Sequence, residues 1–124
     1  METMNRPYDN FLVKILGFGF SIRQIRSART RVDENLNDNI ISDVLAQYLE
    51  CKIDDVDSHL ALVVSEPVQI TGTTSVLVRL PKRDHWTGRY QFKKITCMVA
   101  VQPKYDLVIN EATKMILELD ELDE

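Results

Sequence analysis

The spacing of apolar residues changes near position 58, and this change limits the folds that the chain can adopt. Between residues 40 and 51, apolar side chains recur at positions i, i+3, i+4 and i+7, which is the spacing of an amphipathic helix. After the acidic turn Asp54–Ser58, apolar residues gather in short runs rich in β-branched side chains, which favour strands. The sequence therefore predicts a helical N-terminal part followed by a sheet.

Two helices are predicted in the first part. Ser21 and Gln24 stand at the capping-box spacing, so the first helix is predicted from Ser21 to about Val32. The second is predicted from Ile40 to about Cys51. The outer face of the first helix would be basic and would carry Arg23, Arg26 and Arg31.

A sheet is predicted from the apolar runs Leu60–Val64, Val68–Thr71, Ser75–Leu80 and Tyr90–Val101. Gly72 and its threonine neighbours predict a hairpin between the second and third runs, and Pro81 ends the third because it lacks a ladder donor. The expected fold class is α+β, with two N-terminal helices packed on an antiparallel β-sheet, a meander of about four to five strands.

The C-terminal stretch of residues 107–122 is ambiguous. It fits a helix capped by Asn110, and it fits a strand about as well. Acidic residues from Glu118 onward are unfavourable at a helix C-terminus, so a strand over Lys114–Leu119 is preferred. We expect one domain over residues 1–124, with residues 119–124 as an acidic tail that can fray.

The cysteine content and the hydropathy favour an intracellular protein. Cys51 and Cys97 are too few to form a disulfide scaffold, and they are predicted to be reduced thiols, although their spacing cannot decide whether they pair. The apolar run Phe11–Phe20 is too short to span a bilayer, and no signal peptide is visible. The expected localisation is cytoplasmic, or within a viral particle, and no membrane partner is expected.

The formal net charge of −4 conceals four blocks of alternating sign. The net charge is +4 over residues 1–32, −8 over 33–66, +6 over 67–105 and −6 over 106–124. The blocks either neutralise each other in the folded chain or produce a molecule with a basic side and an acidic side. A molecule of the second kind could steer partners or pack head to tail with copies of itself.

The loop from Lys82 to Tyr90 is the strongest candidate for a binding site. Within nine residues it collects Arg83, His85, Trp86, Arg89 and Tyr90, and Trp86 is the only tryptophan of the chain. Trp, Tyr and Arg are the side chains most often found at interface hot spots. Basic residues mixed with aromatic ones can also hold a phosphate backbone while stacking a base. A third interpretation is a hairpin loop whose tryptophan covers the edge of the core.

No catalytic residue, metal site or cofactor is predicted. The acidic turn before His59 has no further ligand at a suitable spacing, and Cys97 lies in an apolar strand where a thiol is normally inert. The predicted function is a non-enzymatic protein–protein interaction module, such as a subunit, an adaptor or an inhibitor, with another protein or copies of itself as partner. The first alternative is a nucleic-acid-binding accessory protein that uses the basic helix and the Trp86 loop. The second is a small enzyme in which His59, His85 or Cys97 takes part.

Overall fold

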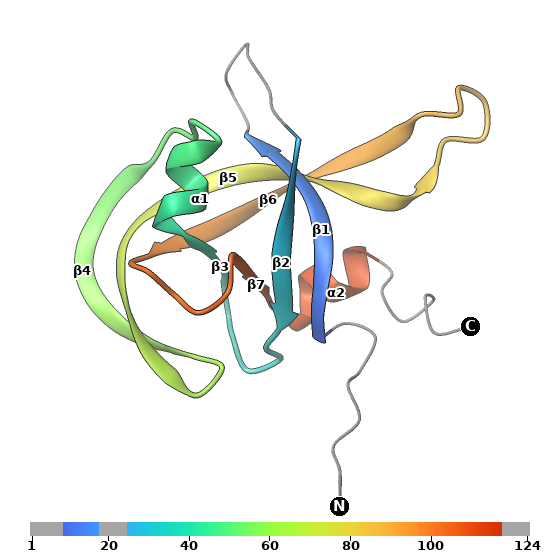
Figure 1. Cartoon of the computed structure of the whole chain (residues 1–124). Helices are drawn as coiled ribbons and strands as arrows, with labels where there is room; N and C mark the ends of the chain where they lie inside the picture. The colour runs from blue at the N-terminus through green and yellow to red at the C-terminus, as the bar shows by residue number, and fades with distance from the viewer. Residues whose placement is uncertain (1–8, 18–24, 118–124) are drawn as a thin grey trace, which may run out of the picture.

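The computed structural model describes residues 9–17 and 25–117, and the strands and short helices of these residues form a β-barrel (Figure 1). The order of the elements is β1 (Asp9–Gly17), β2 (Arg26–Val32), β3 (Asn39–Ser42), α1 (Asp43–Tyr48), β4 (Asp54–Val63), β5 (Glu66–Arg83), β6 (Tyr90–Ala100), β7 (Leu107–Ile109) and α2 (Glu111–Ile116).

Six of these strands close on themselves in the order β1-β2-β7-β3-β6-β5, because β5 also pairs with β1. The β2–β7 and β3–β6 pairs are parallel, and the other pairs of the ring are antiparallel. Strand β4 pairs with β5 outside the ring and forms one end of the sheet. Figure 1 shows β4 on one side of the molecule, and the far ends of β5 and β6 extend beyond the barrel on the opposite side.

The length of β5 makes this arrangement possible. Alternate residues of its central part are buried, as expected for a strand with one face turned toward a core. Its first half pairs with β4, and residues 76–78 then pair with β1. At the closing pair, Ile15 of β1 lies opposite Val78 of β5, and both side chains are fully buried.

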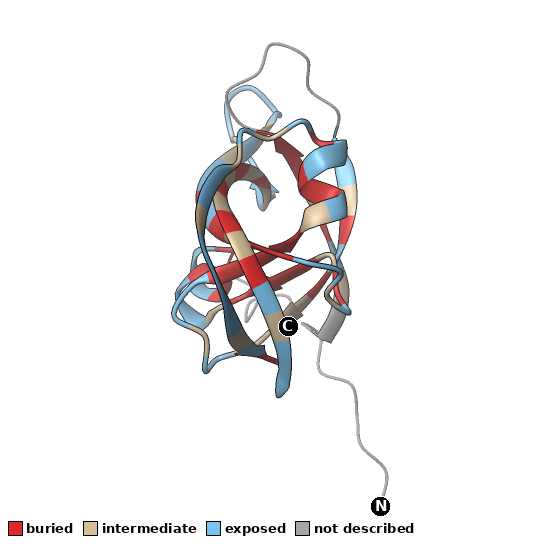
Figure 2. Cartoon of the chain, turned by 90° about the vertical axis from the view of Figure 1, so that its left-hand side faces the viewer, coloured by how far each residue is buried: buried red, intermediate tan, exposed pale blue. Residues whose placement is uncertain are grey.

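The buried residues form two clusters. The larger one fills the barrel and includes residues from the barrel strands, α1 and the end of α2. The smaller one lies beneath the β4–β5 hairpin and is built around Ile40, Val63, Ile70, Ala100, Tyr105 and Val108. Figure 2 views the molecule from the β4 side, where β4 itself is mostly exposed.

The predicted helix over residues 21–32 is wrong for the part that the structure describes, because residues 26–32 form strand β2. Ala28 and Thr30 are buried while Arg29 between them is exposed, which is the period of a strand. Pairing with β1 and β7 therefore overrides the local capping pattern. Residues 21–24 lie outside the described residues.

The predicted helix over residues 40–51 is correct only in its middle. Residues 39–42 form β3, a strand buried on both faces between β6 and β7. The helix α1 begins after Ser42, whose Oγ accepts a hydrogen bond from the backbone N–H of Leu45 at 2.9 Å. The prediction of two N-terminal helices packed on a sheet is therefore wrong, since β-structure dominates and both helices are short.

The predicted meander is also wrong. Gly72 lies inside β5, where a Cβ would come within 2.7 Å of Ile53 Cγ2, so close packing and not a turn requires glycine there. Pro81 also lies within β5. The β4–β5 turn is at Val64 and Ser65, whose φ angles of 50° and 65° suit a two-residue hairpin turn.

The preference for a strand over Lys114–Leu119 is wrong for the residues that the structure describes. They form the end of α2, which is capped by the Asn110 side chain, and Leu117 is the C-cap residue. The Nζ atom of Lys114 lies 3.3 Å from a carboxylate oxygen of Glu34 and 3.4 Å from one of Glu111. Residues 118–124, including the predicted tail, lie outside the described residues.

Candidate interaction surface

The projecting part of the β5–β6 hairpin, from Arg79 to its partner Phe92, is called the arm below. Residues 76–78 of β5 are paired with both β1 and β6, but from Arg79 onward β5 pairs with β6 alone among the described strands. The arm therefore leaves the barrel as a two-stranded ribbon (Figure 1). Because two strands cannot bury both of their faces, the arm offers side chains to the surroundings along its length.

Asp84 organises the turn at the tip of the arm. Its carboxylate accepts hydrogen bonds from the backbone N–H groups of Trp86 at 2.8 Å and Thr87 at 2.9 Å. These bonds, first the one from Thr87, hold the pKa of Asp84 below its ordinary value. Gly88 supplies the positive φ of 71° that the return of the chain requires.

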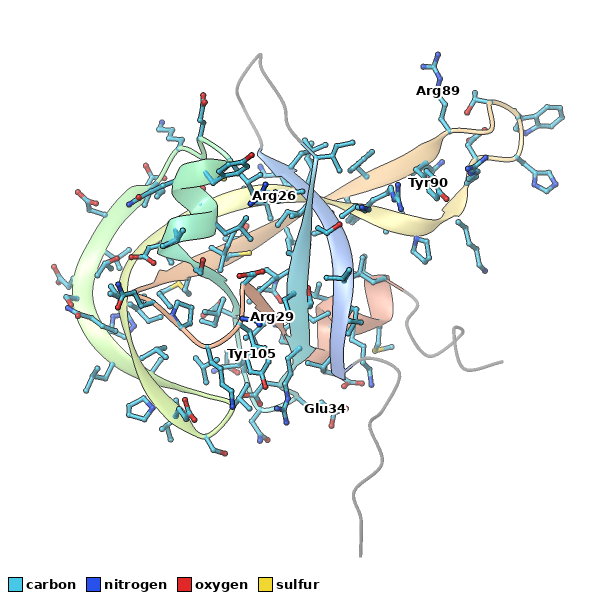
Figure 3. The ribbon with its side chains drawn as sticks, viewed as in Figure 1. Arg26, Arg29, Glu34, Arg89, Tyr90 and Tyr105 are labelled. Atoms are coloured by element: carbon cyan, nitrogen blue, oxygen red, sulfur yellow. The ribbon has the colours of Figure 1, made fainter. Side chains whose placement is uncertain are left out.

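Tyr90 stacks with two arginines on the paired strands of the arm, which are called its shaft below. The guanidinium carbons of Arg79 and Arg83 lie 3.9 Å and 4.8 Å from the centroid of the Tyr90 ring. A hydrogen bond from Arg83, followed by the charges of both arginines, lowers the pKa of the Tyr90 hydroxyl. Figure 3 shows Tyr90 along the shaft, while Arg89 points away from it.

Trp86 at the tip is 93% exposed. The interpretation in which this side chain covers the edge of the core is therefore wrong. The structure brings the predicted residues Arg83, His85, Trp86, Arg89 and Tyr90 together on the arm. It also adds Asp84, which the sequence reasoning missed. Asp side chains often accept hydrogen bonds from backbone N–H groups two or three residues later in a turn, as Asp84 does here. An aspartate four residues before Gly88 is therefore a sequence signal for a turn that could have identified Asp84.

The other predicted basic residues do not join this surface. Arg23 lies outside the described residues. Arg26 lies on β2 and covers the Tyr48 ring at 4.0 Å, and Figure 3 shows it on a different part of the molecule from Arg89. Arg31, also on β2, donates a hydrogen bond of 2.8 Å from Nη1 to the Tyr105 hydroxyl.

The charge blocks are separated at the two sides of the molecule and mixed between them. The arm carries four Lys or Arg residues and one Asp, and Lys93 and Lys94 follow at its base, whereas residues 50–66 at the β4 side carry five Asp or Glu residues and one Lys. Near α2, however, Lys114 is paired with Glu34 and Glu111. The basic and acidic blocks therefore lie on separate sides at the arm and at β4, whereas near α2 they neutralise each other.

The residues suggested for catalysis lie apart from each other. His85 is at the tip of the arm, whereas His59 is on β4 and is paired with Ile70. Cys97 is fully buried in the barrel, and burial raises the pKa of its thiol. Cys51 is partly buried, and both cysteines are free thiols. Among the described residues, no group of three or more His, Cys, Asp or Glu residues is arranged to hold a metal ion.

Comparison with protein-family models and with curated proteins found no match to this chain. Within residues 9–17 and 25–117, neither helix has the length and apolar character needed to cross a membrane.

Proposed function

We propose that this chain is a non-enzymatic interaction subunit that binds another protein molecule through the tip of the arm. The exposure of Trp86 is the observation that carries the proposal. A large aromatic side chain gains free energy when its surface is removed from water, and at this position folding removes almost none of that surface. A partner that covers the tip would gain it instead.

The surroundings of Trp86 support a specific contact. The turn beneath it is held by the Asp84 carboxylate, and the shaft is held by the stacking of Arg79 and Arg83 on Tyr90. A side chain on an ordered support loses less conformational entropy on binding than one on a loose loop. The cations around the tip favour a partner with an acidic surface, because complementary charges raise the association rate.

The proposal is tested by affinity capture from the source organism with the wild type and two variants of the protein. The test variant carries Trp86→Ala and Arg89→Ala. The matched control carries Lys104→Ala, an exposed cation on the loop between β6 and β7. We expect the wild type and the control to retain the same protein partner and the test variant to lose it. Equal capture by all three forms would contradict a role for the arm.

A gel-shift experiment with single- and double-stranded nucleic acid tests the alternative partner class. Contacts with phosphates must weaken steeply as salt rises, because counterions are released on binding. A salt-dependent shift that the Trp86→Ala and Arg89→Ala substitutions abolish would replace the protein partner by nucleic acid. The absence of a shift at low salt is the result that we expect.

A further inference from the structure

Strand β4 carries an exposed surface that complements the tip of the arm. Among the described strands it pairs with β5 alone, so its second edge is not used in the sheet. Leu60 and Leu62 are 71% and 68% exposed, and Pro67, which is paired with Leu62, is exposed as well. Asp54, Asp55 and Asp57 near the start of the strand are also exposed. This apolar and acidic surface, residues 54–67, is called the β4 surface below.

The charges of the β4 surface decide which strand or loop can bind it. An unused strand edge can pair with another strand, and acidic side chains on it oppose pairing with an identical edge. Two β4 surfaces are both acidic and two arms are both basic, so neither like pair gains from opposite charges. The arm of one copy and the β4 surface of another combine opposite charges and place an exposed tryptophan beside exposed leucines.

The positions of the two surfaces require that the contact joins separate molecules. Figure 1 shows the arm and β4 on opposite sides of the barrel. One copy would therefore use its arm toward one neighbour and its β4 surface toward another. Such a head-to-tail contact repeats, and it forms a ring if the rotation closes and a filament if it does not.

We infer that the partner of the arm is a second copy of this chain, with Trp86 packed on Leu60 and Leu62 and Arg89 near the β4 aspartates. This inference depends on the proposed function, because it names the partner for the same tip. The contact combines a buried aromatic anchor with opposite charges at its rim, as protein interfaces commonly do. The rim charges make the association weaker at high salt.

The test uses two variants: one has substitutions in the arm, and the other has substitutions in the β4 surface. The arm variant carries Trp86→Ala and Arg89→Glu, and the β4 variant carries Asp55→Arg and Leu60→Arg; all four side chains are exposed. The control is Met115→Lys, at an exposed side chain on α2 that belongs to neither surface. Sedimentation velocity is measured over a concentration series for each protein and for an equimolar mixture of the two variants. Thermal melts of all four proteins, recorded at low concentration, show that each one is folded.

We expect the wild type and the control to form oligomers as the concentration rises. Each variant alone remains a monomer, because one of the two surfaces is missing in every copy. The mixture forms a one-to-one dimer that grows no further, because the intact arm of the β4 variant meets the intact β4 surface of the arm variant. Trp86→Ala alone weakens the wild-type association at least about 30-fold, as expected for a hot-spot residue.

Two results would overturn the inference. The first is a wild type that stays monomeric at the highest concentration reached. The second is a mixture in which both variants stay monomeric although the wild type assembles, which would place the contact elsewhere. If the wild type is monomeric but affinity capture still depends on Trp86, the proposed function stands with a different protein as partner. If neither self-association nor affinity capture depends on Trp86, both proposals fail.

Discussion

Replacing Trp86 by alanine should leave the stability of the monomer almost unchanged, although tryptophan substitutions usually destabilise a protein strongly. A fully buried tryptophan side chain removes up to about 250 Å² from water. Trp86 is 93% exposed, so folding removes only the small remainder. At about 25 cal/mol per Å² this remainder contributes about 0.4 kcal/mol to the free energy of unfolding. The backbone N–H of residue 86, which donates to Asp84, is retained in the variant.

The matched comparison is Ile95→Ala in β6, the strand that forms one side of the arm. Ile95 is 5% exposed and lies in the barrel core. Truncation of a buried isoleucine costs about 2–5 kcal/mol, because it loses transfer free energy and leaves a cavity. For a domain of this size the thermal midpoint should fall by about 8 °C or more.

The free energy of unfolding is measured by urea denaturation followed by far-UV circular dichroism. Fluorescence is unsuitable because the substitution removes the only tryptophan. The protein concentration is kept low so that association does not add to stability. A decrease of more than about 1 kcal/mol in the free energy of unfolding of Trp86→Ala would show that the indole is packed against the protein in solution and is not exposed.

Three further predictions concern the barrel, the tip and the thiols. Gly72→Ala should destabilise the fold by about 1–3 kcal/mol in urea denaturation, because the new Cβ meets Ile53 and the Asp54 carbonyl at 2.7 and 2.9 Å; an unchanged midpoint would refute the packing there. The pKa of Asp84 is lowered in the folded state, so its stabilisation of the tip is complete at neutral pH and is lost as the pH falls through that value, below 3.8. An NMR pH titration that follows the side-chain carboxyl carbon of Asp84 should have its midpoint below 3.8, and a midpoint at or above that value would contradict this sign. Burial raises the pKa of Cys97, so iodoacetamide at pH 8 should leave it unmodified in the native protein and modify it only after unfolding, as mass spectrometry can show.

The β character of the second half of the chain could be predicted from the sequence because its pattern is local. The predicted run Tyr90–Val101 matches β6 closely, whereas β5 was predicted as two strands joined by a hairpin at Gly72, and the first residues of β4 as a turn. A proline in a central strand would remove a ladder hydrogen bond. Pro81 is tolerated in β5 because it lies in the arm, where β5 has a described partner strand on one side only. Gly72 resembles a turn residue in sequence, but its role depends on Ile53, which the chain brings close only after folding.

The barrel itself could not be predicted, because its closure depends on pairs that are distant in sequence. Ile15 meets Val78 only in the folded chain, and the parallel pairs of β2 and β3 involve β7 and β6 far along the sequence. Residues 26–32 show why local signals failed, since helix propensities are weak and tertiary pairing overrides them. The residues of the predicted loop lie together on the arm because they are contiguous in sequence, and their role in binding stays a prediction. Their exposure and the exposure of Leu60 and Leu62 required the fold.

Photo-cross-linking from position 86 shows which residues the tip of the arm contacts in the assembled protein, and thereby whether it meets the β4 surface of another copy. Trp86 is replaced by a photoreactive phenylalanine analogue, and the purified protein is irradiated at a concentration at which the wild type assembles. We predict covalent dimers in which position 86 is joined to a peptide containing residues 54–67, and none when the same analogue replaces the exposed Met115 of α2 instead. Irradiated protein that stays monomeric, or dimers joined through any other peptide, would show that the tip does not bind the β4 surface of another copy.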